Sequence, residues 1–266
     1  MSVPDMSPSF DLLLESNQQA AGAWKEFARR SETGVIVEHD GVIAAFSGGP
    51  IPFFNAQFLP EPCRDATEFE RRARAAAAYG KASGLPWIFF LCHEWAPENA
   101  IEIATGAGLS PMMPLTGMVA TELAPPRRAL PPMEIVSAAG DKRVQDQVFL
   151  LNAAAYGMPG EAMLAANTNG FFAEGMYSAV GYVDGTPVST ATTFAVEGVL
   201  YVALVATHPD HQGKGYAEAV MRESLRMASQ ATGLTRTVLH ASDAGHPVYL
   251  RMGYRDTATF TVLVAG

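Results

Sequence analysis

The chain has 266 residues, of which 48% are hydrophobic, and a formal net charge of −9. Its size and apolar content suffice for one large domain or two domains of ordinary size. The negative charge argues against a general nucleic-acid binder, because no broad basic surface is available to attract phosphate backbones.

The N-terminal stretch MSVPDMSPSFDLLLESN has no cluster of positive charge and no long apolar core, so no secretory signal is expected. The densest apolar run, LPWIFFLC at residues 85–92, is much shorter than the ~20 residues that a membrane-spanning helix requires. The two cysteines, Cys63 and Cys92, are too few and too far apart for a disulfide framework, and the pair Cys92-His93 lacks the further ligands of a zinc site. We therefore expect a soluble cytoplasmic protein without a metal site or membrane contact, in which both thiols are small buried side chains.

The first half begins with a predicted hairpin, since Asp40-Gly41 lies between apolar residues that alternate in the manner of strands. An alanine-rich helix follows, and Thr67 with Glu70 is a plausible capping box at its start. The segment LAPPRRALPPM, residues 123–133, contains four prolines and has the composition of an interdomain linker.

The second half is predicted to open with helices at residues 142–156 and 163–167. A hairpin near 178–205 follows, in which Asp184-Gly185 supplies the turn. Strands are predicted at 199–206 and 236–241, then a short helix at 246–251 and a final strand at 258–264. A long helix after residue 215 has one apolar face, and Gly233 is its expected C-terminal stop.

The two halves show the same succession of elements. Gly84 and Gly233 each end a helix before a strand, and the two Asp-Gly turns are separated by nearly the same number of residues. The alternative is that any two α/β stretches look alike at this level. We favour a mixed α/β fold made of two tandem copies, with domains at residues 1–130 and 131–266.

An apolar strand, a proline turn and two glycines precede a predicted helix in the segment VLYVALVATHPDHQGKGYAEAV. Free amides and the helix dipole at such an end favour an anion such as phosphate. A nucleotide P-loop is excluded because Lys214 is followed by Gly215, and the dinucleotide fingerprint is excluded because Glu218 occupies its third glycine position. A glycine-rich turn without a ligand is the structural alternative.

The segment Gln212-Gly213-Lys214-Gly215-Tyr216-Ala217 matches the pattern Gln/Arg-x-x-Gly-x-Gly/Ala. Here the sequence resembles the GNAT superfamily of acyltransferases, in which a loop of this form holds the pyrophosphate of acetyl coenzyme A. PVYLRMGY, residues 247–254, resembles a second signature of the family. The resemblance covers about residues 178–266 and implies two tandem GNAT-like folds with acetyl-CoA as co-substrate.

The resemblance also implies roles for individual residues. Tyr249 matches the family tyrosine assigned as general acid to the leaving thiolate, although typical pKa values of ~10 and ~8.5 make full proton transfer uphill by about 2 kcal/mol, so a hydrogen bond is an equally reasonable role. Ser242 stands where many relatives carry a cofactor-contacting asparagine. The cofactor-binding residues implied are Val205, Ala206, Thr207, Gln212, Gly213, Lys214, Gly215, Tyr216, Ala217 and Ser242.

The general base is left open by the sequence. Many relatives carry a glutamate on the strand before the loop, but VLYVALVAT contains no acid. The nearest candidates are Glu197, His240 and Asp243, and the base could also come from the first half or from solvent.

The first half has no counterpart of the glycine-rich loop, because GGPIPFFNAQFLPEPC offers no run of free amides. We expect this copy to have lost cofactor binding, with core and loop roles favoured over substrate contact for Phe53, Phe54, Asn55, His93, Glu94 and Trp95. The predicted function is transfer of an acetyl group to a primary amine of a small molecule or peptide. The alternatives are a non-catalytic acyl-CoA sensor, and an acyltransferase for another acceptor atom or a longer acyl chain. A monomer and a homodimer are both compatible with the sequence.

Overall fold

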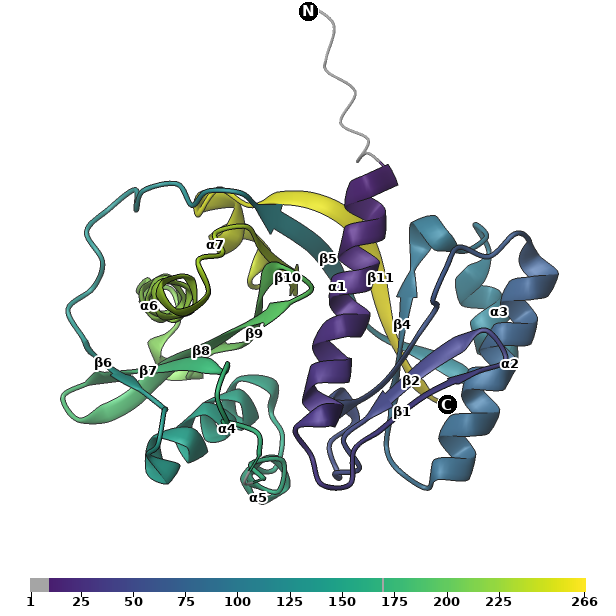
Figure 1. Ribbon diagram of the computed structural model, residues 1–266, viewed down its shortest axis with the longest axis horizontal. Helices are drawn as coiled ribbons and strands as arrows, with labels where there is room; N and C mark the ends of the chain where they lie inside the picture. The colour runs from purple at the N-terminus through teal and green to yellow at the C-terminus, as the bar shows by residue number, and fades with distance from the viewer. Residues whose placement is uncertain (1–9, 169) are drawn as a thin grey trace, which may run out of the picture.

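The computed structural model describes residues 10–168 and 170–266. Residues 1–9 lie outside the described part of the chain. They include the start of the N-terminal stretch in which no secretory signal is expected. The described strands form one eleven-stranded mixed sheet in the order β1-β2-β3-β4-β11-β5-β10-β9-β8-β7-β6 (Figure 1). The predicted mixed α/β fold is therefore confirmed.

The elements of the first half are α1 (Phe10–Arg29), β1 (Val35–His39), β2 (Val42–Phe46), η1 (Pro52–Phe54), β3 (Asn55–Phe58), α2 (Ala66–Ser83), β4 (Ile88–Cys92), η2 (His93–Trp95), α3 (Ala100–Gly106) and β5 (Leu109–Ala120). Those of the second half are β6 (Glu134–Ser137), α4 (Lys142–Tyr156), α5 (Gly160–Leu164), β7 (Tyr177–Val183), β8 (Thr186–Val196), β9 (Val199–Thr207), η3 (Pro209–His211), α6 (Tyr216–Thr232), β10 (Thr237–Ala241), α7 (His246–Arg251) and β11 (Arg255–Ala265).

The succession hairpin, strand, helix, strand, helix, strand occurs in both halves, as the internal repeat predicted. Each Asp-Gly pair forms a two-residue hairpin turn in which both residues have positive φ, 45° and 80° at Asp40-Gly41 and 49° and 76° at Asp184-Gly185. This backbone matches the twist of the flanking strands, which explains why Asp-Gly is so strong a hairpin signal. Gly84 and Gly233 both end their helices in the left-handed conformation.

Two local predictions were wrong in position. The N-cap of α2 is Asp65, whose carboxylate accepts a hydrogen bond from the Glu68 amide at 2.8 Å, and not Thr67. The spacing of Asp65-x-x-Glu68 is the same as that of Thr67-x-x-Glu70. The earlier pair forms the start of the helix, because aspartate is a strong N-cap. The second helix of the second half is α5, which begins and ends three residues before the predicted 163–167.

The two halves exchange their last strands. β11 lies between β4 and β5, and β5 lies between β11 and β10, with antiparallel pairing throughout. The last strand of each half therefore pairs on one edge with the other half's last strand and on its other edge with the strand that follows the other half's long helix. The backbone hydrogen bonds of this central ladder join the halves into one sheet.

Helix α1 lies at the middle of the molecule and contacts both halves (Figure 1). Its buried Asn17 donates to the Cys92 sulfur on β4 at 3.2 Å, and its buried Gln19 donates to the Val196 carbonyl on β8 at 3.0 Å. In its second turn, Glu15 forms a bidentate ion pair with Arg236, with both distances 2.6 Å. The first helix thus belongs to the core of both copies.

The two cysteines are free: Cys92 is buried, Cys63 is half-buried, and burial raises the pKa of the two thiols to about 12 and about 11. None of the described helices combines the length and apolar character that a bilayer span would need.

Gly80 and Gly106 offer a matched test of the packing in the first half. A Cβ at Gly80 of α2 would overlap the buried Trp87 indole, whereas a Cβ at Gly106 of α3 meets no atom within 4 Å. Helix propensity favours alanine by about 1 kcal/mol at either site, but overpacking costs about 1–3 kcal/mol at the first. We expect Gly80→Ala to lower the free energy of unfolding by up to about 2 kcal/mol and Gly106→Ala to leave it unchanged or raise it. Urea titration measures both, and equal stability of the two variants would contradict the packing.

Candidate functional site

Strands β9 and β10 pair only at their N-terminal ends. The parallel ladder joins Leu200 to Thr237 and Tyr201 to Val238, whereas β9 stays paired with β8 as far as Thr207. Residues 202–207 and 239–241 therefore diverge, and we call this divergence the fork. The β9 edge that faces the fork has backbone groups available to a ligand.

A β-bulge shapes the β9 side of the fork. The register with β8 shifts between Thr190 and Thr192, so that Leu204 and Val205 together oppose one residue, and Leu204 has a φ of 52°. The buried Asn152 of α4 donates to the Leu204 carbonyl at 3.2 Å and to the Val148 carbonyl at 2.8 Å. Asn152 thus holds the bulge, a role that its position on an amphipathic helix did not reveal.

The glycine-rich loop leads from β9 into α6 as predicted. Gly213 and Gly215 have φ values of 75° and 90°, a conformation that glycine adopts without strain. Gly215 is the N-cap of α6 and no side chain caps this end, while the first backbone bond inside the helix runs from the Ala219 amide to the Gly215 carbonyl. The amides of the first helical turn are therefore available to an anion, and the positive end of the helix dipole favours one.

Tyr249 and the fork share one face of the sheet. Tyr249 of α7 is 8% exposed and belongs to the same apolar cluster as Val202 of β9, Ala241 of β10 and Val220 of α6. Ser242 follows β10 directly, and its carbonyl accepts the amides of Gly245 and His246 at 2.9 Å each. The structure thus brings together the predicted residues of β9, the loop, Ser242 and Tyr249 around the C-terminal ends of β9 and β10.

The opposite face of the fork holds a polar chain that the sequence did not predict. The Tyr201 hydroxyl lies 2.8 Å from Nδ1 of His240, and Nε2 of His240 lies 3.4 Å from Oγ of Ser16 on α1. Tyr201 and Ser16 are buried, and the Phe260 ring lies edge-on to the imidazole with a centroid distance of 4.7 Å. Burial lowers the pKa of His240 to about 3. Both ring nitrogens are engaged, and the imidazole is neutral at physiological pH.

The three candidate bases have different surroundings. Glu197 occupies the turn between β8 and β9, at the opposite end of β9 from the loop, and so lies roughly 20 Å along the strand from the fork. Asp243 is exposed in the loop after β10. Of the three, His240 lies at the fork, whereas Glu197 lies at the far end of β9.

In the first half, the corresponding helix start is already capped. The Asp65 carboxylate occupies the end of α2 that corresponds to the free end of α6. The six first-half residues for which core and loop roles are expected make structural contacts. The Asn55 amide group donates to three loop carbonyls, Glu94 accepts the Thr259 amide at 2.9 Å, and His93 bonds to Thr261 at 2.8 Å. Phe54 and Trp95 are buried, and the Phe53 carbonyl accepts the Trp24 indole.

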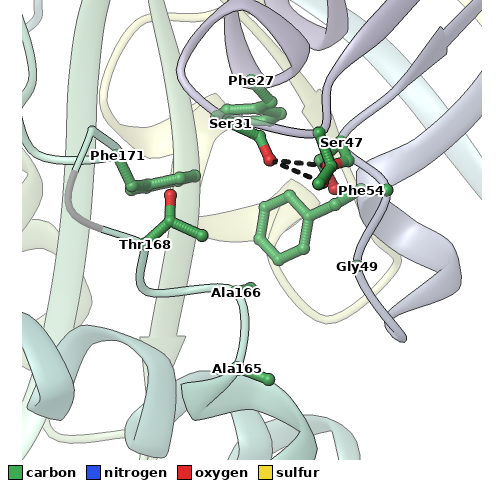
Figure 2. A pocket seen from close by; sticks show the side chains of 11 residues that line it. Phe27, Ser31, Ser47, Gly49, Phe54, Ala165, Ala166, Thr168 and Phe171 are labelled. Atoms are coloured by element: carbon green, nitrogen blue, oxygen red, sulfur yellow. Dashed lines mark hydrogen bonds between the residues drawn. The ribbon is translucent and has the colours of Figure 1, made fainter.

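A separate pocket of about 210 Å³ lies where the two halves meet (Figure 2). Phe27, Phe54 and Phe171 form its apolar wall, and the Ser31 hydroxyl on its rim donates to the Ser47 carbonyl at 2.6 Å. The pocket contains none of the residues predicted for the site.

Comparisons with known proteins agree with the geometry of the second half. Residues 148–254 match the model of the Acetyltransferase (GNAT) family. A search of the curated proteins found no match.

Solved structures share the fold of the whole chain. A GCN5-related N-acetyltransferase from Kribbella flavida is 19% identical with a TM-score of 0.70, over 94% of this chain and 95% of that one. A functionally unknown conserved protein from Staphylococcus epidermidis is 15% identical with a TM-score of 0.63, over 87% and 94%. A tandem GNAT protein from the clavulanic acid biosynthesis pathway is 13% identical with a TM-score of 0.57, over 98% and 97%. At these identities the likeness establishes the fold alone.

Asn152→Ala should destabilise the protein by about 1–3 kcal/mol, because it leaves the buried Leu204 carbonyl without a donor. Arg143→Ala, at an exposed position of the same helix, serves as the control and should change stability by less than about 0.5 kcal/mol. Denaturant unfolding of both variants measures the difference. An Asn152→Ala variant as stable as the control would show that the bulge does not need this donor.

His240 should make stability depend on pH. Its pKa in the folded protein is about 3, below the ordinary ~6.5, so the unfolded chain takes up a proton as pH falls through 6.5 and the folded chain does not. The contribution of His240 to the free energy of unfolding is complete above pH ~6.5 and is lost as the pH falls toward 3. Between pH 7 and pH 5 the free energy of unfolding should fall by about 1–2 kcal/mol.

His240→Asn, which keeps a polar partner for Tyr201, should show a smaller loss of stability between pH 7 and pH 5. Unfolding titrations at the two pH values test this. If the variant and the wild type lose the same free energy of unfolding between pH 7 and pH 5, His240 takes up its proton in the folded protein as readily as in the unfolded chain.

Proposed function

Because the chain contains a GNAT-family domain at residues 148–254, we propose that it transfers an acetyl group from acetyl-CoA to a primary amine of a small-molecule or peptide acceptor. The transfer is direct, without a covalent enzyme intermediate. The observation that carries the proposal is the uncapped N-terminus of α6 next to the fork between β9 and β10.

The residues around the fork fit the acyl donor. Phosphate oxygens accept hydrogen bonds, and the loop at residues 212–217 offers backbone amides at a helix N-terminus and no carboxylate within the loop. The β9 edge at Val205, Ala206 and Thr207 lies beyond the last pair with β10 and can bond to the amides of a pantetheine arm as an added strand would. Bound there, acetyl-CoA supplies an activated acyl carbon and a thiolate leaving group.

The second half can also stabilise charge as it develops. A β9 amide that faces the fork can donate to the acyl oxygen when negative charge forms on it. Tyr249 stands on the same face, and burial raises the pKa of its phenol, so the hydroxyl stays protonated. A higher pKa makes full proton transfer to a thiolate still less favourable. We therefore assign Tyr249 as a hydrogen-bond donor to the leaving sulfur.

No carboxylate base is assigned to β9, which carries no acidic residue from Val199 to Thr207. The ring nitrogens of His240 are engaged by Tyr201 and Ser16. The acceptor amine then enters in its neutral form and loses its proton to water. Positioning of the two reactants supplies much of the rate.

A second candidate function is an acyl-CoA sensor without turnover. It is favoured by the same absence of an acidic side chain on β9. The sensor would use the loop and the fork for binding and would release no thiol.

Calorimetric titration of acetyl-CoA into the wild type, Gly215→Ala and Gly215→Glu tests the donor site. Both substitutions place a side chain at a φ of 90°, with a similar backbone strain of about 1–2 kcal/mol, but only glutamate adds negative charge beside the free amides. We expect saturable binding by the wild type, weaker binding by Gly215→Ala and none by Gly215→Glu.

Thermal melts of the three proteins show whether each is folded. A folded wild type that does not bind acetyl-CoA would overturn the proposal. Thiol release measured across a panel of amines then separates the two functions, because the enzyme releases CoA with an accepted amine and the sensor releases none.

A further inference from the structure

The linker at residues 123–133 is bonded to the second half at its start, and residues 125–130 beyond that point are exposed. The Ala124 amide donates to the Met252 carbonyl after α7 at 2.8 Å, and Arg222 of α6 donates to the Ala124 carbonyl at 2.6 Å. From there the chain passes α6 on its way from β5 to β6 (Figure 1). The two hydrogen bonds fix the start of the linker against both helices of the candidate site.

Arg128, in the middle of the linker, lies at the glycine-rich loop. Its Nη2 atom is 3.5 Å from the Gly213 carbonyl, at the outer limit of a hydrogen bond. A Cβ built on Gly215 would lie 3.3 Å from the same nitrogen and 3.5 Å from Cδ of Pro131. The guanidinium therefore lies beside the N-cap of α6, and the missing side chain at Gly215 leaves it room.

The charges around this loop are unbalanced. Glu218, in the first turn of α6, is paired with Arg222 at 2.8 Å. Across residues 10–168 and 170–266, no carboxylate lies within salt-bridge distance of Arg128 or of Lys214, whose Nζ instead donates to the Asp210 carbonyl at 3.3 Å. Two cations without counter-ions thus flank uncapped amides in a protein whose net charge is −9. Together these groups favour an anion that carries more than one charge.

We propose that the interdomain linker is part of the acyl-donor site and that Arg128 binds a phosphate of the donor's nucleotide portion. This inference rests on the proposed function, since it assumes that acetyl-CoA binds at the loop. An arginine can offer two parallel N–H groups to one phosphate, and its weak bond to the Gly213 carbonyl is easily exchanged for that contact. The linker then both joins the two halves and closes one side of the donor site.

Arg127 provides a matched control. It is the adjacent residue, it is also exposed, and the described residues show no hydrogen bond or ion pair to its side chain. Arg127→Gln and Arg128→Gln change the net charge by the same amount, so a general electrostatic effect would weaken binding equally in both variants. A local contact would weaken it only in Arg128→Gln.

The experiment is titration of acetyl-CoA into the wild type, Arg127→Gln, Arg128→Gln and Arg128→Lys at two salt concentrations. We expect Arg128→Gln to raise Kd about tenfold, Arg128→Lys to lie between it and the wild type, and Arg127→Gln to stay within about twofold. The salt dependence of binding should be shallower in Arg128→Gln. Thermal melts should be unchanged, because both side chains are exposed.

Dephospho-CoA identifies the phosphate. If the loss in Arg128→Gln disappears with this probe, Arg128 contacts the 3′-phosphate; if the loss remains, it contacts the pyrophosphate. Equal Kd values for Arg128→Gln and the wild type, or equal losses in the two glutamine variants, would overturn the inference while leaving the donor site intact. Absence of binding by the folded wild type would overturn the proposed function together with it.

Discussion

The mutual exchange of β5 and β11 is the constraint on which the other features depend. Each strand fills a place in the sheet beside a strand of the other half, β11 against β4 and β5 against β10. Backbone groups that each half would otherwise leave exposed at an edge are therefore satisfied by the other half. Both copies therefore contribute strands to one sheet, and α1 adds buried polar contacts to both.

The fork is possible because β10 is secured on its other side. β10 pairs along its whole length with β5, so it stays in place although β9 leaves it after Val238. The bulge at Leu204, held by Asn152, lies on the part of β9 that has left β10. The fork then separates two different environments: the loop and Tyr249 on one face, and Tyr201 with His240 against α1 on the other.

Local signals in the sequence predicted the elements well, because turns and caps are fixed by a few neighbouring residues. The helices at 142–156 and 246–251 and both Asp-Gly turns lie where they were predicted. The strand exchange was not foreseen, since the pattern of β5 or β11 does not state which strand it pairs with. Asn152 and Ser16 were missed for a similar reason. Each is a polar residue on a helix, and its hydrogen-bond partner lies on a strand that is distant in the sequence.

The position of β11 also has a consequence for synthesis on the ribosome. β4 and β5 emerge early, but the strand that separates them is made of residues 255–265. Until that segment is translated, the nascent first half has two strands with an unfilled place between them, and a direct β4–β5 pairing would have to be undone later. Chains of this kind are exposed to misassembly during translation. Completion of the first copy therefore waits for the last strand of the second.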